Sequence, residues 1–365
     1  MGSAQTRLQS TWSDKQHVDL ISEAVSQALI GTGLRIEDVD FVIDSGSDFL
    51  DGRSISNCGF LGAMGAHHKE ESRVEEDGLW AALYASTKIG SGSARVGLVI
   101  AYSKSSESDP RNYWTSLAEP FTQRPVGLDQ YSVAGLSAQA YLASAGIGAD
   151  ALTAVSERNY SAAGANAKVD ADLALLDSPE WSDIVASPLR RRDLARPVDG
   201  AVALVLANAD ITRQIGAPAA WITGLGTATD QHFIAARSLS SLPAAQVAAQ
   251  QAYRSSGLSP VDLDLVEVSA NSTAGELQVL EALGLADQAR AIDLYADGAG
   301  EHINQSGGGL PADVVMATGL VRMHEVASQL TGRSERPTGG ATRGLAHGTG
   351  GLGMQNHCVI TLETA

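Results

Sequence analysis

The chain is 365 residues long, and its 25 basic residues against 42 acidic ones give it a formal net charge of −17. Because a negative surface repels polyanions, this charge argues against nucleic acid as a partner. No apolar stretch reaches the ~18 residues of a membrane span, and the first 15 residues lack the apolar centre of a secretion signal, so we expect a soluble, cytoplasmic protein without a membrane partner.

Helical and strand patterns alternate along the first half of the chain, which indicates an α/β fold with largely buried sheets. Apolar periodicity predicts helices at Val18–Leu29, Gly78–Ile89, Val133–Ala145 and Leu152–Ala162. Apolar runs predict strands at Asp40–Asp44, Val96–Tyr102 and Pro197–Asn208. The turn-rich residues 103–128 and the basic stretch 166–196 indicate a loop domain, about 103–196, inserted within a first half of residues 1–212.

The second half, residues 213–365, repeats this alternation. Strands are predicted at Trp221–Leu225, Leu263–Val268 and Cys358–Leu362. Helices are predicted at Ala244–Ser255, Gly275–Leu283 and Val314–Gln329.

One segment of the first half recurs in the second. Residues 24–43, AVSQALIGTGLRIEDVDFVI, align with residues 248–267, AAQQAYRSSGLSPVDLDLVE, so that Gly33 matches Gly257 at an offset of 224 residues. Each copy has the pattern of a helix, a glycine turn that ends it, an acidic connection and a buried strand. Solenoid repeats are roughly 20 to 50 residues long, so this offset instead indicates two homologous halves packed together. The aligned aspartates are Asp38 with Asp262 and Asp40 with Asp264.

A duplicated α/β chain with an insertion in its first half resembles the thiolase superfamily, and four segments carry the resemblance. They are RRRDLARPVDGAVALVL (190–206), VEVSANSTAGELQVLEALGL (266–285), NQSGGGLPADVVMATG (304–319) and AHGTGGLGMQNHCVITL (346–362). The first is similar to the segment that closes the family's loop domain, and the second to the E-x-H-D-A-F stretch of the sterol-carrier-type branch. The third is similar to the family's N-P-S-G-G and G-H-P segment, and the fourth to its terminal glycine-rich turn and strand. The resemblance implies a duplicated thiolase fold, layered αβαβα.

The same resemblance implies that the usual catalytic groups are absent. A thiolase uses a cysteine at the N-terminus of a buried helix, where the helix dipole and a histidine lower its pKa. Aligning VEEDGLW with the family's C-x-S-G motif puts Glu75 at that cysteine, and a carboxylate cannot form the acyl thioester. Ser269 takes the histidine position of E-x-H-D-A-F, and Asn271 follows two residues later. Asp313 falls at the histidine of G-H-P, and His347 falls at the second cysteine.

Two of these positions have a plainer interpretation beside the functional one. Glu75, with Glu76 and Asp77, forms either an acidic catalytic cluster or the acidic first turn expected at a helix start. His347 is either a general base beside a substrate or a histidine whose ring is satisfied by backbone in a tight turn.

A retro-aldol cleavage, which some thiolase-like enzymes of this branch perform without the nucleophilic cysteine, needs a base for a hydroxyl proton and donors for an enolate. His347 and Asp313 are candidate bases, and Ser269 and Asn271, at a strand end, are candidate donors. Such aldolases carry a tyrosine in the site, and Tyr295 is the nearest tyrosine in sequence to the segment that starts at residue 304.

Coenzyme A, as part of the substrate, is the cofactor that the resemblance implies. Guanidinium groups suit phosphate contacts, so Arg190, Arg191 and Arg192 of the loop domain are candidate ligands, with a salt-bridged surface run as the alternative. Ser306 and Gly307 belong to a glycine-rich segment that allows close backbone approach, either to a ligand or to the other half.

Three other patterns do not predict a dinucleotide, metal or disulfide site, because the sequence around them does not fit one. A G-x-G-x-x-G match at 348–353 continues into a strand instead of opening a helix, so no NAD site is expected. His67 and His68 lack the spacing of a zinc pair, and no metal is expected. Cys58 and Cys358 provide no disulfide framework, and we expect both to be buried, unreactive side chains.

The first function hypothesis is therefore a thiolase-like, acyl-CoA-binding enzyme without a cysteine nucleophile, with the retro-aldol type as one form of it. The resemblance implies a dimer joined edge to edge, or a complex with a thiolase-like subunit or with a small subunit that carries an OB fold and a zinc ribbon. Convergence of Glu75, Asp313 and His347 on one cavity would favour this enzyme.

The alternative is a non-catalytic subunit that stabilises or completes an active partner. It is favoured by the apparent lack of the family's apolar N-terminal strand, since the chain offers only RLQST there. A cavity filled by bulky side chains such as Trp80 or Met316 would also favour it.

Overall fold

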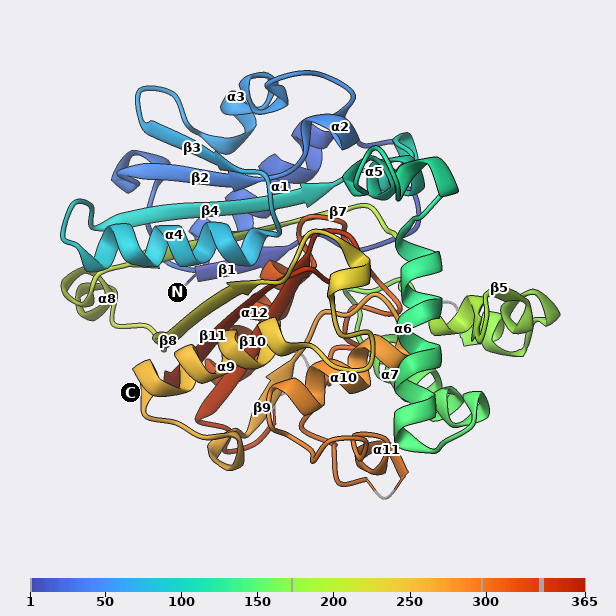
Figure 1. The fold of residues 1–365 in the computed structure, drawn as a ribbon. Coiled ribbons are helices and arrows are strands. Elements are labelled where there is room, and N and C mark those ends of the chain that lie inside the picture. The colour runs from blue at the N-terminus through green and yellow to red at the C-terminus, as the bar shows by residue number, and fades with distance from the viewer. Residues whose placement is uncertain (1, 172, 297, 335–337, 365) are drawn as a thin grey trace.

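The computed structural model describes residues 2–171, 173–296, 298–334 and 338–364. Two mixed sheets lie one above the other with two helices between them, and further helices cover the outer face of each sheet (Figure 1). These layers confirm the predicted αβαβα arrangement. In the described ranges, no helix has both the length and the apolar character needed to cross a membrane.

The first sheet has the strand order β1-β7-β4-β2-β3. Its strands are β1 (Gly2–Gln5), β2 (Phe41–Ser45), β3 (Glu70–Val74), β4 (Val96–Ser103) and β7 (Gly200–Ala207). Strands β3, β2 and β4 are parallel, whereas β7 is antiparallel to both β4 and β1. The expectation that the N-terminal strand is missing is wrong. The segment GSAQ carries a weak strand signal because it contributes only Ala4 to the hydrophobic core, yet its backbone pairs with residues 202–205.

The second sheet repeats this topology in the order β8-β11-β10-β9. Its strands are β8 (Ala220–Thr229), β9 (Leu265–Glu267), β10 (Arg343–Gly350) and β11 (Asn356–Thr364). Strands β9 and β10 are parallel, β11 is antiparallel to β10 and β8, and a parallel bridge from Val266 to Ile303 stands where β3 stands in the first sheet. The two halves therefore share one strand order and one set of directions, as the sequence repeat predicts.

The aligned aspartates make the same contacts in both halves. A carboxylate oxygen of Asp40 accepts hydrogen bonds from the backbone N–H groups of residues 95 and 96, at 2.7 and 2.9 Å, where β4 begins. An oxygen of Asp264 accepts bonds from the N–H groups of residues 342 and 343, at 2.8 and 3.0 Å, where β10 begins. Each aspartate thus fixes the start of the strand next to its own.

Successive side chains of a strand face opposite layers of the fold, one layer with the central helices and one with the outer helices. The central helices are α4 (Gly78–Gly90) and α12 (Thr318–Leu330), and the outer ones are α1 (His17–Ile30), α9 (Pro243–Ser256) and α10 (Thr273–Ala282). On β4, Val99 and Ala101 pack in the cluster of the central helices, whereas Leu98 and Ile100 pack against α1. Apolar side chains on both faces explain why the strand has a continuous hydrophobic sequence.

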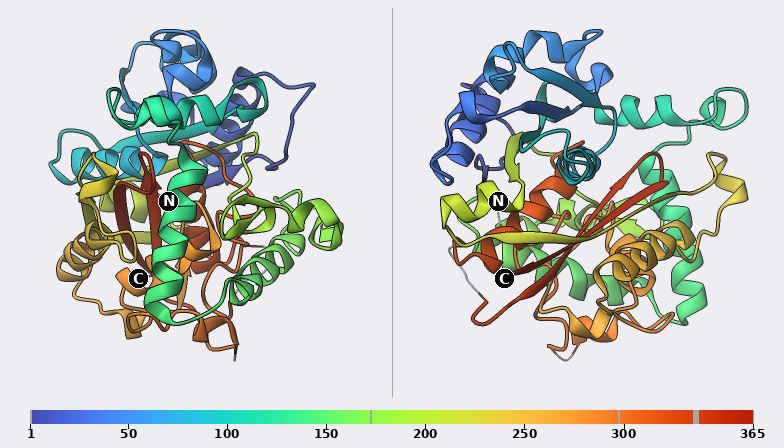
Figure 2. Two further views of the ribbon diagram at one scale, coloured as in Figure 1. Left: turned by 45° about the vertical axis from the view of Figure 1, so that its right-hand side comes forward. Right: turned by 90° about the vertical axis from the view of Figure 1, so that its left-hand side faces the viewer.

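The segment between β4 and β7 forms an insertion that lies alongside the second half (Figure 2). It contains α5 (Pro110–Leu117), α6 (Gln130–Ala145), α7 (Thr153–Gly164) and the short hairpin of β5 (Ile184–Ala186) and β6 (Leu189–Arg190). Ala138 of α6 and Val155 of α7 pack in one cluster with Leu277 of α10. The remaining short helices are α2 (Asp48–Asp51), α3 (Leu61–Met64), α8 (Ala209–Ile215) and α11 (Asp293–Ala296).

The matched aspartates give a direct test of the duplication. Asp40→Ala and Asp264→Ala each remove an acceptor of two backbone N–H groups, so each should lower the free energy of unfolding by about 1–2 kcal/mol at pH 7 in urea titrations. Burial acts to raise the pKa of both carboxyls, but the backbone N–H groups outweigh it and the pKa of each is lowered. The stability that they contribute is thus present at neutral pH and should fade as acid protonates them.

The control is Glu37→Ala, which removes an exposed carboxylate in the same connection and should change stability by less than about 0.5 kcal/mol. A loss at only one of the two aspartates would contradict the structural equivalence of the halves.

Candidate functional site

The N-terminal ends of the two central helices meet, and one carboxylate joins them. Asp77 accepts a hydrogen bond from the Leu79 N–H at the start of α4, at 2.8 Å, and another from the Gly319 N–H at the start of α12, at 2.9 Å. Gly319 must be glycine, because an added Cβ would lie 2.3 Å from an Asp77 oxygen. The Gly78 N–H donates to the carbonyl of Met316 at 2.8 Å, so the two helix starts are also joined through the backbone.

A cavity of about 60 Å³ lies beside this junction, at the carboxyl ends of β9 and β10. Its polar lining includes Glu76, Asp77, Tyr113, Ser269, Asn271 and Asp313. Since one water occupies about 30 Å³ of liquid, the space holds about two water molecules. The structure thus places three carboxyl groups, two hydroxyls and an amide around a space too small for an acyl chain.

The carboxyl groups of this cavity are poor acids. Burial raises the pKa of Asp313 to about 6, although the Thr318 hydroxyl donates a hydrogen bond to it at 2.7 Å. Burial also raises the pKa of Asp77 to about 7 against the opposing effect of its two N–H donors. The pKa of Glu76 is likewise raised by burial, and its main opposing contact is the Asn356 amide, at 2.5 Å. Near neutral pH, the site can therefore exchange protons.

Met316 adopts a backbone conformation that is unusual for its residue type. Its φ of 74° lies in the left-handed region, which costs about 1–3 kcal/mol for a non-glycine residue and persists only where the surroundings enforce it. Its carbonyl accepts from the Gly78 N–H and from the Ser45 hydroxyl, at 3.0 Å, and its sulfur accepts from the Tyr113 hydroxyl at 3.3 Å. Met316 lines the cavity and reduces its volume.

Two of the predicted catalytic residues lie outside this cavity. The Glu75 side chain is 55% exposed, and its carboxylate accepts from the Asp48 N–H at 3.0 Å on the surface. His347 is fully buried, and its Nε2 lies 3.0 Å from Nδ1 of His357 in a stacked pair. Burial, followed by the charge of His357, lowers the pKa of His347 far below its usual value, so the ring is held neutral. Of the acidic cluster, Asp77 caps the helix and Glu76 faces the cavity.

The glycine-rich sequence around His347 predicts a turn, and this prediction is wrong. Residues 343–350 form β10 in the middle of the second sheet, and the turn follows at residues 351–355. Glycine is required within this strand because the central helices pack directly on it. A Cβ at Gly344 would lie 2.4 Å from Val326 of α12, and one at Gly348 would lie 3.1 Å from Leu79 of α4.

Neither cysteine lines the cavity. Cys58 is exposed, which corrects the expectation that it is buried. Cys358 is buried in β11, and burial together with the charges of Asp77 and Glu76 raises its thiol pKa well above the usual value. Because the thiolate is the nucleophilic form, this buried thiol is unreactive.

The predicted coenzyme A ligands lie in two places. Arg190 pairs with Asp150 at 2.9 Å, which fits the surface salt-bridge alternative, and Arg191 is exposed. The Nε of Arg192 is buried without a hydrogen-bond partner among the described residues. An added Cβ at Gly307 would lie 2.6 Å from Ala163 of α7, so this glycine serves close packing.

Ser306 belongs to a buried ionic cluster around Glu267, the last residue of β9. Its N–H and hydroxyl donate to Glu267 at 2.9 and 2.6 Å, and Arg322 of α12 donates to the same carboxylate at 2.9 Å. The Arg322 side chain is only 1% exposed. The cluster ties β9 to α12, and Ser306 is a structural residue within it.

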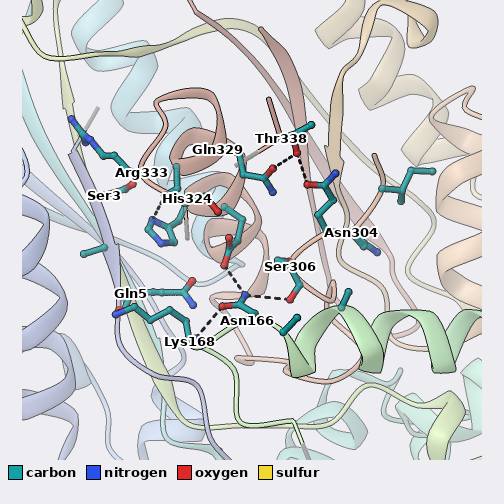
Figure 3. Close-up of a pocket in the computed structure, with 18 of the residues that line it drawn as sticks. Ser3, Gln5, Asn166, Lys168, Asn304, Ser306, His324, Gln329, Arg333 and Thr338 are labelled. Atoms are coloured by element: carbon teal, nitrogen blue, oxygen red, sulfur yellow. Dashed lines mark hydrogen bonds between the residues drawn. The ribbon is translucent and has the colours of Figure 1, made fainter. Parts of the chain in front are cut away.

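A second cavity, of about 900 Å³, lies beyond Ser306 along the C-terminal part of α12 (Figure 3). It is much larger than the cavity at Asp77 but contains none of the carboxyl groups whose pKa values are raised there. The smaller cavity is therefore the candidate catalytic site, because raised carboxyl pKa values and two helix N-termini converge on it.

Sequence reasoning missed one tyrosine and misjudged another. Tyr295 donates to the buried Glu276 at 2.5 Å and does not line the small cavity. Tyr113 of α5 does line it, although it comes from the turn-rich insertion, where no pattern indicated a site residue. An aromatic pair, Tyr113 and Trp114, within an otherwise polar stretch was the available signal.

Comparison with known proteins places this geometry in a family. Residues 226–363 match the family described as thiolase C-terminal domain-like. Sterol carrier protein 2 of Gallus gallus is 35% identical over 122 residues, which cover 32% of this chain and 22% of that protein. The 17-hydroxy-3-oxo-4-pregnene-20-carboxyl-CoA lyase of Mycobacterium tuberculosis is 29% identical over 216 residues, which cover 56% of this chain and 55% of the lyase.

Together these matches support the sterol-carrier-like branch of the thiolase superfamily. The solved structure of an Ltp2-ChsH2(DUF35) aldolase has the same fold, with a TM-score of 0.83 at 23% identity over 100% of this chain and 96% of that one. These two sequence matches are partial, since the chain spans about half of the lyase and less of the sterol carrier protein. The superfamily's layered fold therefore extends over the whole chain, while its sequence signal is strongest in the second half.

The shared cap at Asp77 predicts a large effect of one substitution. Asp77→Ala leaves two buried N–H groups without an acceptor and should lower the free energy of unfolding by about 2–4 kcal/mol. Glu75→Ala, at the position aligned with the thiolase cysteine, should cost less than about 1 kcal/mol. Denaturant titrations of both variants measure the difference, and equal effects would show that Asp77 does not join the helices.

Proposed function

We propose that this thiolase-superfamily chain cleaves a carbon–carbon bond of a 3-hydroxyacyl-CoA by a retro-aldol route, without a cysteine nucleophile. The observation that carries the proposal is the composition of the small cavity. It offers carboxyl groups with raised pKa values together with hydroxyl and amide donors, and neither cysteine of the chain lines it. Retro-aldol chemistry needs a base and an enolate site, and it forms no acyl-enzyme.

Asp313 is the proposed base. Its carboxylate accepts the proton of the substrate hydroxyl, the C–O bond becomes a carbonyl, and the bond between the α and β carbons breaks. The electron pair moves into the thioester, which becomes an enolate, and protonated Asp313 returns the proton to the α carbon. The reaction is redox-neutral and regenerates Asp313. A pKa of about 6 suits this exchange at neutral pH, since the carboxylate form prevails and its protonated form is still accessible.

Ser269 and Asn271 are the proposed donors to the enolate oxygen. Both lie in the loop after β9 and line the cavity with Asp313. The side-chain Oδ1 of Asn271 accepts from the Ser272 hydroxyl at 3.3 Å, which leaves the side-chain N–H₂ as the group to donate. Coenzyme A is then part of the substrate, and Arg191 and Arg192 of the insertion remain the proposed contacts for its phosphates. No metal or NAD enters this route.

A partner subunit is part of the proposal. The lyase and aldolase relatives support the reaction class, and the structural relative is named as an assembly of two components. The cavity of about 60 Å³ must widen to admit a substrate, and Met316, Tyr113 and Trp114 are the bulky side chains that bound it. A thiolase-like subunit, or one with an OB fold and a zinc ribbon, is the proposed cause of this widening. Edge-to-edge dimerisation is proposed through β3, the outer strand of the first sheet.

Two observations favour the second candidate, a non-catalytic subunit that completes an active partner. Glu75 and His347 do not converge with Asp313 on the cavity, so the arrangement expected of the enzyme is only partly present. The bulky Met316 is among the side chains that line the cavity, whereas Trp80 is not, since its indole N–H donates to Thr227 at 3.1 Å elsewhere. The other support for this candidate, the missing N-terminal strand, is removed by β1.

Activity measurements separate the two candidates. The chain, co-purified with the products of neighbouring genes, should release a carbonyl product and a shortened acyl-CoA from members of a 3-hydroxyacyl-CoA panel. Asp313→Asn keeps an acceptor for Thr318 but removes the base, so kcat should fall by roughly 10²- to 10⁴-fold. Since only the carboxylate accepts the proton, the wild-type rate should fall about tenfold per pH unit below about 6.

Glu75→Gln is the matched control, because it neutralises an exposed carboxylate outside the cavity and should leave kcat within about twofold. If the complex with Asp313→Asn keeps its activity and its pH profile, the partner carries the catalytic groups and this chain has the non-catalytic role.

A further inference from the structure

The cavity of about 900 Å³ has a position and a wall unlike those of the catalytic site. It lies between β1 of the first half and the loop 301–306 of the second, with His324 and Gln329 of α12 on one side. Thr318 at the start of α12 lines the catalytic cavity, so at 1.5 Å per residue the two cavities are about 9–17 Å apart along the helix. The volume falls in the range of small-molecule sites, roughly 300–1,000 Å³.

Uncharged polar groups dominate the wall. Amide and hydroxyl side chains from both halves line it, and the labelled ones in Figure 3 include Gln5, Asn166, Asn304, Ser306, Gln329 and Thr338. His324 adds a neutral ring, because burial, followed by the charges of Lys168 and Arg322, lowers its pKa to about 3.

The charged groups of the wall are mostly engaged by the protein itself. Arg158 donates to the backbone carbonyls of Gly300 and Ile303, the latter at 2.8 Å. Lys168 reaches the carbonyl of Gln5 at 3.5 Å, and Glu325 accepts from the Asn166 amide at 3.2 Å. A charged ligand would have to compete with these contacts.

Gln5 differs in that both polar atoms of its side chain lack a partner, whereas Arg158 and Asn304 of the same wall each leave one buried nitrogen unpartnered. Its side chain is at the end of β1, the residue is 1% exposed, and neither its amide oxygen nor its amide nitrogen has a hydrogen-bond partner among the described residues. In Figure 3, the amide extends from β1 toward Asn166 and α12. Buried amides are nearly always hydrogen-bonded, and an orphaned donor and acceptor side by side indicates a missing partner.

We propose that this cavity binds an uncharged small molecule that bears a carboxamide, held by paired hydrogen bonds to Gln5. A carboxamide presents one acceptor and two donors, so it can satisfy both orphaned atoms of Gln5 at once. The ligand bridges the two halves of the chain, because β1 and the loop 301–306 come from different halves. The site is separate from the catalytic cavity and does not depend on the proposed reaction.

Matched neutral and charged probes test this assignment on the full chain. Succinamide and succinate have the same shape, and ligand-observed NMR titrations at fixed ionic strength give their dissociation constants. Succinamide should bind in the range of roughly 1–10 mM, as expected of so small a ligand. Succinate should bind at least about threefold more weakly, and raising the salt concentration should leave the succinamide affinity unchanged.

Two variants locate the binding. Gln5→Leu should weaken succinamide about tenfold or more and raise the thermal midpoint of the free protein, since it removes an orphaned buried amide. Lys168→Met should change succinamide binding by less than about threefold, and Lys69→Met, outside the cavity, should leave it unchanged.

Tighter binding of succinate that is lost in Lys168→Met would make the cavity an anion site and overturn the proposal. Absence of binding by both probes, or succinamide binding that survives Gln5→Leu, would also overturn it and assign the space to water alone.

Discussion

The structure depends on one carboxylate that holds two helix starts together. Asp77 accepts from one N–H group in the first turn of α4 and one in the first turn of α12, which are the central helices of the two halves. Each helix N-terminus carries a partial positive charge that favours the carboxylate form of Asp77, against the burial that raises its pKa to about 7. Because both sheets pack on these helices, the contact fixes the relation of one half of the chain to the other.

This constraint also decides the chemistry that the junction can support. The resemblance to thiolases implies that an ordinary member uses a helix N-terminus to activate a cysteine. Here the ends of both central helices are occupied by the protein's own carboxylate, and the nearby thiol of Cys358 stays protonated in β11. The groups left to act are the carboxyls, hydroxyls and amide around the small cavity. Their raised pKa values suit proton transfer, and Met316 is one of the bulky side chains that line the space.

The sequence predicted the fold more completely than the site. The repeat around Gly33 and Gly257 predicted the duplication, and the aligned aspartates make equivalent contacts because a side-chain cap is a local interaction. Strand β1 was missed because Gly2–Gln5 contributes one apolar side chain to the core, and β10 because close helix packing demands glycine within it. Both failures occur where long-range packing outweighs local propensity.

The site was predicted in part for the same reason. Ser269 and Asn271, which follow β9, and Asp313, which precedes α12, line the cavity because the family pattern locates the ends of these two elements well. Glu75 and His347 do not line the cavity. At the start of a helix, a displacement of one or two residues turns a side chain such as that of Glu75 away from the site. A strand mistaken for a turn has the same effect on His347. Tyr113 comes from an insertion whose path no local pattern specifies, so only the folded chain reveals it.

The central claim is that this thiolase-superfamily chain works through oxygen groups and never forms an acyl-cysteine. Rapid quenching of the complex during turnover of a 3-hydroxyacyl-CoA, followed by intact mass spectrometry, tests it most directly. The account predicts equal amounts of carbonyl product and shortened acyl-CoA, with the chain at its unmodified mass. An acyl adduct on Cys358, or efficient thiolysis of a 3-ketoacyl-CoA by the isolated chain, would contradict it.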